Sequence, residues 1–214
     1  MCTFHIFTIF PNILDSYFKE SILKKAIDRK RFAVKFYNIR DFCKDKHRTV
    51  DDTPYGGGPG MVMKIEPIYK ALKTKKLFPS TKTGRIILLS PRGKVLDTRI
   101  VKRLATYKNI SFICGRYEAV DERVAEHIAD EVISIGDYTL AGGELAAAVI
   151  IESIARHIPG VVGNKESVTK QDFPQYTKPD LFSPHKKINW AVPAELLSGN
   201  HAKIKTWREN QIKK

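Results

Sequence analysis

The chain has 214 residues, of which 43% are hydrophobic and 28% are charged, a composition typical of a globular protein with one good-sized α/β domain. Its longest apolar runs, such as AAAVII, are too short to cross a bilayer, so we expect no membrane partner. Lysine and arginine number 37 against 23 aspartates and glutamates, and the resulting net charge of +14 favours a nucleic acid as partner.

The first third of the chain predicts two strands and two helices around a glycine-rich loop. Alternating apolar residues indicate the first strand, and apolar residues at helical spacing indicate the helix that follows it. The segment DDTPYGGGPGMVM, residues 51–63, has few side chains that could pack and predicts a loop. The expected elements are a strand over 4–10, a helix over 13–27, a strand over 31–39 and a helix over 66–76.

From residue 85 onward, strands and helices alternate regularly. The strands are apolar nearly throughout, which is typical of a parallel sheet covered by helices on both faces. We therefore expect an α/β fold with a parallel sheet. The expected strands cover 85–90, 110–115 and 131–136, and the expected helices cover 97–107, 120–129 and 143–158.

The alternation ends at Pro159-Gly160, and the rest of the chain has a different character. Residues 161–187 are polar and contain prolines, which indicates a linker. The tail over 188–214 predicts one or two short helices, the last of them capped by Ser198 or Asn200.

The cysteines and the N-terminus both point to the cytoplasm. Cys2, Cys43 and Cys114 form no CxxC pair and are odd in number, so we expect neither a disulfide nor a zinc site nor any other metal. The apolar N-terminus lacks a basic region and is interrupted by Pro11, which favours a strand over a signal peptide.

Three successive strands are followed by loops rich in glycine and proline, over 90–93, 114–118 and 135–144. Ligands of open parallel sheets bind beyond the carboxyl ends of the strands, where small residues allow close approach of the backbone. Strand–helix connections also use glycine and proline without any ligand, but three such loops in consecutive units favour a binding crevice. Because neither GxGxxG after a strand nor GxxxxGK[ST] occurs, an uncharged purine nucleoside suits these loops better than a phosphate.

Several long motifs recur in order from about residue 4 to residue 210. They resemble the bacterial tRNA (guanine-N1)-methyltransferases, the TrmD family of the SPOUT superfamily. The motifs are HRTVDDTPYGGGPGMVM, LLSPRGK, CGRYEAVDERV, SIGDYTLAGGEL, IARHIPGVVG, PQYTKP and LLSGNHAKIKTWR.

The resemblance implies a domain over 1–160 that forms a trefoil knot, binds S-adenosylmethionine and carries the catalytic site. It further implies a homodimer whose active sites combine residues of both subunits, and a short helical region over 188–214 that contacts tRNA. The residues that match the family's cofactor site are Leu88, Leu89, Ser90, Pro91, Gly115, Tyr117, Glu118, Ser134, Ile135, Gly136, Tyr138, Leu140, Gly142 and Gly143.

The implied reaction transfers a methyl group to N1 of the guanine just 3′ of the anticodon, position 37 of tRNA. A general base must remove the N1 proton, and a cation near O6 stabilises the charge that develops there. Arg156 matches the family's active-site arginine, although a helix pair with Glu152 would also explain an arginine there. We expect Asp172 to be the base, with Gln171 at the ungapped position.

The glycine-rich segment is expected to contact the substrate guanine, because a base that is drawn into a pocket needs close backbone contacts. A mobile surface loop is the alternative. The residues expected to bind substrate are His47, Arg48, Asp51, Asp52, Gly56, Gly57, Gly58 and Gly60.

Three other functions remain open from the residues. A catalytically impaired RNA-binding protein of the same fold would keep the basic charge but would not bind S-adenosylmethionine. A related methyltransferase acting on another RNA position would bind the cofactor and ignore position 37. A nucleotide-dependent oxidoreductase would need a phosphate-binding fingerprint, which the sequence lacks.

Overall fold

The computed structural model describes residues 1–163, 173–186 and 188–212. The chain divides into two compact units, Met1–Gly163 and Asn164–Lys214, each of which is described by itself. The first unit is built on a five-stranded sheet whose strand pairs are all parallel, in the order β2-β1-β6-β5-β8. These strands are β1 (Cys2–Thr8), β2 (Phe32–Asn38), β5 (Gly84–Val95), β6 (Asn109–Cys114) and β8 (Glu131–Ser134).

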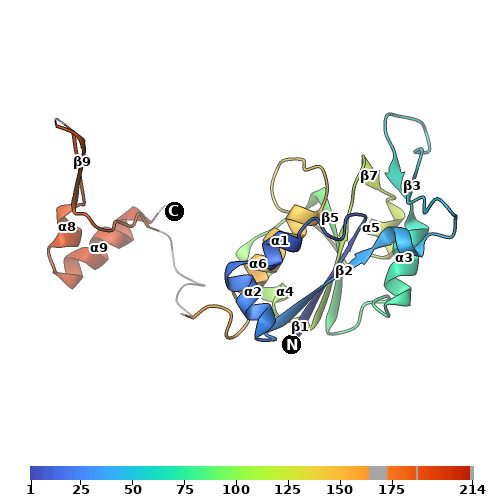
Figure 1. Ribbon diagram of the computed structural model, residues 1–214, viewed down its shortest axis with the longest axis horizontal. Helices are drawn as coiled ribbons and strands as arrows, with labels where there is room; N and C mark the ends of the chain where they lie inside the picture. The colour runs from blue at the N-terminus through green and yellow to red at the C-terminus, as the bar shows by residue number, and fades with distance from the viewer. Residues whose placement is uncertain (164–172, 187, 213–214) are drawn as a thin grey trace. The chain divides into compact units, whose positions relative to one another are not determined.

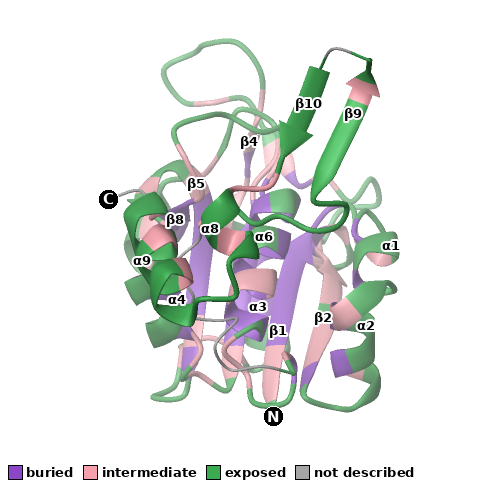
Figure 2. Cartoon of the chain, turned by 90° about the vertical axis from the view of Figure 1, so that its left-hand side faces the viewer, coloured by how far each residue is buried: buried purple, intermediate pink, exposed green. Residues whose placement is uncertain are grey.

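Helices cover both faces of this sheet (Figure 1). The two faces form separate apolar cores, and the buried residues concentrate in the central strands (Figure 2). One core contains residues of α1 (Asp15–Phe18), α2 (Ser21–Asp28), α4 (Thr98–Leu104) and α6 (Glu144–Ala155). The other contains residues of the 3₁₀ helix η1 (Ile39–Phe42), α3 (Ile65–Thr74) and α5 (Arg123–His127). The predicted α/β fold with a covered parallel sheet is thus confirmed, whereas the knot stays a prediction.

The predicted helix over 13–27 is wrong, because the structure has two short helices there. Glu20 has an extended backbone and Ser21 has a φ of 52°, in the left-handed region, so the chain turns sharply between α1 and α2. The apolar spacing continues through this turn because both helices pack on the same core. Periodicity alone could not reveal the break.

A second, small sheet ties the glycine-rich segment to the end of a central strand. Its strands are β3 (Asp51–Asp52), β4 (Val62–Met63) and β7 (Ala119–Val120), in that order. β3 and β4 pair antiparallel, so residues 53–61 form the loop of a hairpin, and β4 pairs parallel with β7. The loop after β6 and the glycine-rich loop therefore lie side by side.

The second unit contains an antiparallel hairpin of β9 (Leu181–His185) and β10 (Ile188–Ala191), followed by α8 (Ala194–Leu197) and α9 (His201–Gln211). The predicted cap of the last helix is confirmed at Asn200, whose Oδ1 accepts hydrogen bonds from the backbone of the first turn. The hairpin was not predicted, and β9 lies within the segment that we expected to be a linker. Its apolar residues are mostly exposed, so they lack the one-sided burial that makes a strand recognisable.

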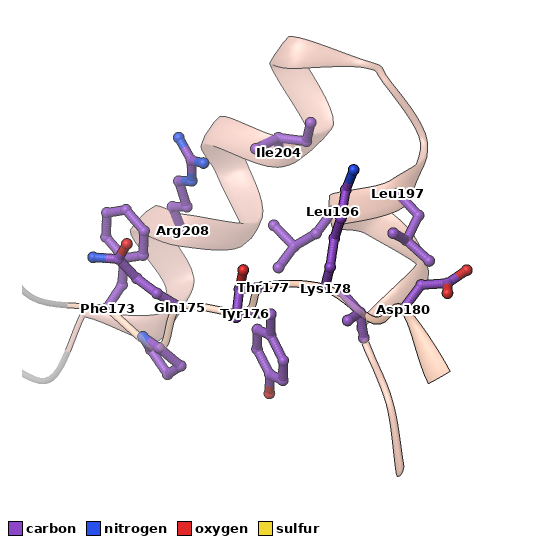
Figure 3. A pocket seen from close by; sticks show the side chains of 12 residues that line it. Phe173, Gln175, Tyr176, Thr177, Lys178, Asp180, Leu196, Leu197, Ile204 and Arg208 are labelled. Carbon is purple, nitrogen blue, oxygen red and sulfur yellow. The ribbon is translucent and has the colours of Figure 1, made fainter. Parts of the chain in front are cut away.

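A pocket of about 340 Å³ lies within this unit, between residues 173–180 and the two helices (Figure 3). The Arg208 guanidinium lies over the Phe173 ring, 5.1 Å from its centroid, and Leu196 of α8 and Ile204 of α9 also line the pocket. None of the described residues of this unit is fully buried. Residues 173–180 thus contact α8 and α9 through partly exposed aromatic and aliphatic side chains.

Candidate active site

A cavity of about 270 Å³ opens beside the irregular part of β5 and the carboxyl ends of β6 and β8. Two of its walls are the predicted loops over 114–118 and 135–144. The first predicted loop, over 90–93, is wrong, because β5 continues to Val95; the segment is an irregularity within the strand, where the pairing with β8 shifts register between Leu89 and Lys94. We keep the name loop for all three segments, and most side chains that line the cavity are apolar or aromatic. Thirteen of the fourteen residues that match the family's cofactor site line this cavity. The exception, Gly136, lies in the third loop and donates a backbone hydrogen bond to Ser134 Oγ at 3.2 Å. The structure thus brings the predicted cofactor residues together in one place.

Close backbone contact between two of the loops explains a glycine in the third loop. The Gly143 N–H donates to the Gly115 carbonyl at 3.0 Å. A Cβ at position 143 would lie 2.9 Å from Cys114 Cα and 3.2 Å from Leu89 Cβ, which leaves no room for a side chain. The third loop thus packs tightly against the ends of its neighbours at Leu89 and Cys114, and an added methyl group would push these segments apart.

A buried ion pair connects the second and third loops with β1 and α6. Glu144, at the start of α6, is 1% exposed, and its carboxylate accepts from the Arg116 guanidinium at 2.9–3.2 Å. Thr8 Oγ1, at the end of β1, donates to the same carboxylate at 2.5 Å. Arg116 also donates to the Ala141 carbonyl at 3.2 Å. One network therefore joins β1, the second loop, the third loop and α6, and sequence motifs alone do not reveal this pairing.

We expect Glu144→Ala to lower the free energy of unfolding by about 3 kcal/mol, because it leaves the Arg116 charge partly buried and unpaired. The loops around the cavity would lose their common anchor, so affinity for S-adenosylmethionine, the cofactor that the resemblance implies, should fall as well. Denaturant unfolding and calorimetry with S-adenosylmethionine measure the two effects.

Glu131→Ala is the matched control for Glu144→Ala. Glu131 is the first residue of β8, at the end of the strand away from the cavity. Its carboxylate accepts two hydrogen bonds of 2.5 and 2.6 Å from the Arg103 guanidinium. Its loss should destabilise the fold without changing cofactor affinity. Equal cofactor affinity in Glu144→Ala and the unsubstituted protein would contradict a positioning role for the buried pair.

The segment expected to bind substrate borders the cavity. The Glu118 N–H donates to the Met61 carbonyl at 3.1 Å, which fixes the glycine-rich hairpin beside the second loop. Gly56, Gly57, Gly58 and Gly60 all have φ between 76° and 123°, a backbone conformation that side chains disfavour. Nothing lies within 4 Å of a Cβ built at the first three, so no side chain covers the backbone there, although the Gly57 N–H donates to the Pro54 carbonyl at 3.2 Å.

Arg40 connects the charged segment over 47–52 to the cavity. Its guanidinium donates to the Tyr117 hydroxyl at 3.0 Å and to the Arg48 carbonyl at 3.3 Å. Asp51 and Asp52 form β3 in the small sheet, and His47 lies in the preceding loop. No motif marks Arg40, since its importance depends on two contacts with distant segments.

Arg156 lies far from the cavity of its own chain. The N-terminal end of α6 borders the cavity, while Arg156 follows its last residue and is exposed. At 1.5 Å per residue, the distance along the helix from Glu144 to Arg156 is about 18 Å. The other expected catalytic residue, Asp172, and the alternative Gln171 lie outside the described residues.

Cys114 is fully buried at the end of β6, and burial raises the pKa of its thiol well above the ordinary value. This environment suits a packing residue and not a nucleophile. Over residues 1–163, 173–186 and 188–212, no cluster of three or more His, Cys, Asp or Glu side chains could hold a metal ion. Within the same ranges, no helix is long and apolar enough to cross a membrane.

The fold and the cavity define an α/β protein with a nucleoside-sized site at the carboxyl edge of a parallel sheet. Residues 2–214 match the family described as tRNA (Guanine-1)-methyltransferase TrmD, and the chain belongs to this family.

Curated relatives agree with the family match over most of their length. A tRNA (guanine-N(1)-)-methyltransferase of Dictyoglomus turgidum is 47% identical over 221 aligned residues, covering 100% of this chain and 86% of the relative. Proteins of the same name from Clostridioides difficile and Dehalococcoides mccartyi (strain CBDB1) are each 44% identical. They cover 97% and 96% of this chain, and 91% and 84% of their own lengths.

Proposed function

We propose that this protein transfers a methyl group from S-adenosylmethionine to N1 of guanosine 37 in tRNA, in the cytoplasm. The observation that carries the proposal is the cavity formed by the three loops, because it gathers the residues that match the family's cofactor site. Family membership supports the reaction class, and the net charge of +14 suits an RNA substrate.

The cavity fits the chemistry of the cofactor. Leu88, Leu89 and Leu140 offer apolar contacts for a purine ring, and the bare backbone at Gly115 and Gly143 allows the close approach that a folded ligand needs. The Glu118 carboxylate lies at the same site and can face a positive charge. When bound, S-adenosylmethionine supplies an electrophilic methyl group on a sulfonium.

The protein's own task is to make guanine N1 nucleophilic. N1 of neutral guanine carries a proton, which we assign Asp172 to remove as general base. As this proton leaves, negative charge develops on O6, and the fixed positive charge of Arg156 stabilises it there. A nitrogen nucleophile needs no covalent adduct with the enzyme, which agrees with the buried, packed position of Cys114.

The glycine-rich hairpin holds the guanine in this proposal. Nothing lies within 4 Å of a Cβ built at Gly56, Gly57 or Gly58, so an unstacked base can approach the backbone of this hairpin without side-chain obstruction. Asp51 and Asp52 can accept hydrogen bonds from N1 or N2 of the guanine, and His47 and Arg48 can meet phosphate.

A homodimer completes the site. Because Arg156 lies about 15 Å along α6 from Ala146, the residue of this helix that lines the cavity, we assign the arginine that acts there to the second subunit. An exposed apolar face supports this arrangement: Leu145 and Val149 of α6 are 59% and 45% exposed, and Phe10, Ile13 and Tyr17 are exposed as well. The Tyr17 hydroxyl donates to Glu152, which keeps α1 beside α6. Such a face is typical of a surface covered by another chain.

Methyl transfer to two unmodified tRNA transcripts tests the function directly. With labelled S-adenosylmethionine, we expect label in the transcript with G37 and none in the transcript with A37. Label in both would favour a methyltransferase acting on another RNA position. Label in neither, with no heat of cofactor binding, would favour a non-catalytic RNA-binding protein.

A further inference from the structure

A second cavity in the first unit is a groove of about 770 Å³ lined by residues 42–49 and 64–74. One wall is the loop over 43–49, and the other is α3 with the residue before it. We call it the α3 groove. Phe42, Pro67 and Tyr69 form an apolar floor, and the loop wall is rigid because the Asp45 carboxylate accepts from the Thr49 N–H and hydroxyl at 3.0 and 2.8 Å.

Positive charge is concentrated around this groove. Four lysines line it, namely Lys44, Lys64, Lys70 and Lys73. The two segments that form its walls, 43–49 and 64–76, contain eight lysines and arginines and two acids. Their net charge of +6 is a large share of the +14 of the whole chain. Both acids, Asp45 and Glu66, line the groove beside the four lysines, so the lining side chains themselves carry a net charge of +2.

Aromatic rings beneath the lysines add a second feature of RNA-binding surfaces. Tyr69 is partly exposed in the groove, with the Lys73 ammonium 5.5 Å from its ring centroid. The Lys75 ammonium lies 5.7 Å from the centroid of Phe42. Lysines over aromatic rings can bind phosphates while the rings contact sugars or bases.

The loop that forms one wall of the α3 groove also contains residues that the proposed function assigns to substrate. His47 and Arg48 lie in this loop between the lining residues Asp45 and Thr49, and Arg48 is joined through Arg40 to Tyr117 of the cavity. An RNA chain that meets these residues while its base enters the cavity would have its neighbouring nucleotides close to the groove. Nothing else described so far uses the four lysines.

We propose that the α3 groove binds the sugar–phosphate backbone of the substrate RNA beside the modified nucleotide. This inference rests on the proposed function for the position of the reacting base. The lysines neutralise phosphates and the apolar floor receives the sugars, so the groove contributes affinity and orientation without reading sequence.

The test is the double charge reversal Lys70→Glu/Lys73→Glu on the exposed face of α3. Its matched control is Lys82→Glu/Lys108→Glu, with the same change of charge just before β5 and β6, at the opposite edge of the sheet from the cavity. Binding of an unmodified tRNA transcript is measured over a series of KCl concentrations. The kcat and KM for tRNA and the affinity for S-adenosylmethionine are measured on the same proteins.

For the groove variant we expect at least about tenfold weaker tRNA binding and a plot of log K against log salt that is shallower by about 1.4–1.8, since two phosphate contacts are lost. KM for tRNA should rise, while kcat at saturating tRNA and cofactor affinity stay unchanged. The control variant should bind tRNA with nearly the original salt slope.

The proposal would be overturned if the groove variant and the control had equal tRNA affinity and equal salt slopes. The groove would then not be a binding site for RNA. Failure of the proposed function is separately visible, because RNA binding does not depend on methyl transfer. A protein that methylates no transcript, yet loses RNA binding in the groove variant alone, would support the groove and contradict only the reaction.

Discussion

Arg156→Ala is expected to lower kcat for methyl transfer by about 10²–10³, or about 2.7–4 kcal/mol, as for the loss of one preorganised group that stabilises an oxyanion. Cofactor affinity should be nearly unchanged, because Arg156 is at the far end of α6 from the cavity that its own chain forms. Single-turnover methylation of the G37 transcript, together with calorimetry, separates the two quantities.

Mixed dimers test from which subunit the arginine acts. Leu140 lines the cavity and is partly exposed, so Leu140→Arg should block the cofactor without disturbing the core. Each variant alone should be inactive. When the two chains are mixed at random, half of the dimers are mixed and have one intact site, so activity should return to about a quarter of the original. If mixed dimers isolated through two different tags show no activity, the arginine does not act across the interface.

Asp172→Ala is expected to lower the rate of methyl transfer by about 10²–10⁴, the usual contribution of a positioned general base. Without it, the N1 proton has no acceptor and guanine stays a poor nucleophile. S-adenosylmethionine should bind with its original affinity, since the base acts on the RNA and not on the cofactor. The measurement is again the single-turnover rate with the G37 transcript.

Gln171→Ala is the control that separates the two aligned positions. It changes the neighbouring side chain and should leave the rate close to that of the unsubstituted enzyme. Near-full activity in Asp172→Ala would show that the base lies elsewhere. A large loss of activity in Gln171→Ala alone would indicate that Gln171, at the ungapped position, is the residue that contacts the substrate.

Local patterns were sufficient for the parallel strands and for the loops that follow β6 and β8, but they placed a loop at 90–93, where β5 continues to Val95. Strand β6 could be predicted because its residues are apolar on both faces, a pattern that only a covered sheet produces. The loops followed from glycine and proline at the strand ends, because these residues mark turns wherever they occur. Thirteen of fourteen cofactor positions then met in one cavity, since parallel strands bring their carboxyl ends to one edge.

Local patterns failed where contacts between distant segments decide the backbone. The turn at Ser21 interrupts an unbroken apolar period, because two short helices can cover one core as well as a single helix can. Neither β9 nor β10 has a buried face, so apolar and polar residues do not alternate along them as they do in a half-buried strand. Arg40 matched no motif, since its two partners are 8 and 77 residues away in the chain.

The amino-acid sequence by itself determined the fold class, the family and the residues of the three loops, because these depend on residue type and order along the chain. Only the tertiary structure decided that Glu144 and Arg116 form a buried pair, that the glycine-rich hairpin pairs with β7, and that Arg156 is remote from its own cavity. The physical reason is distance along the chain. Thr8 and Glu144 are 136 residues apart, and nothing in either local sequence specifies the other until the sheet brings them together.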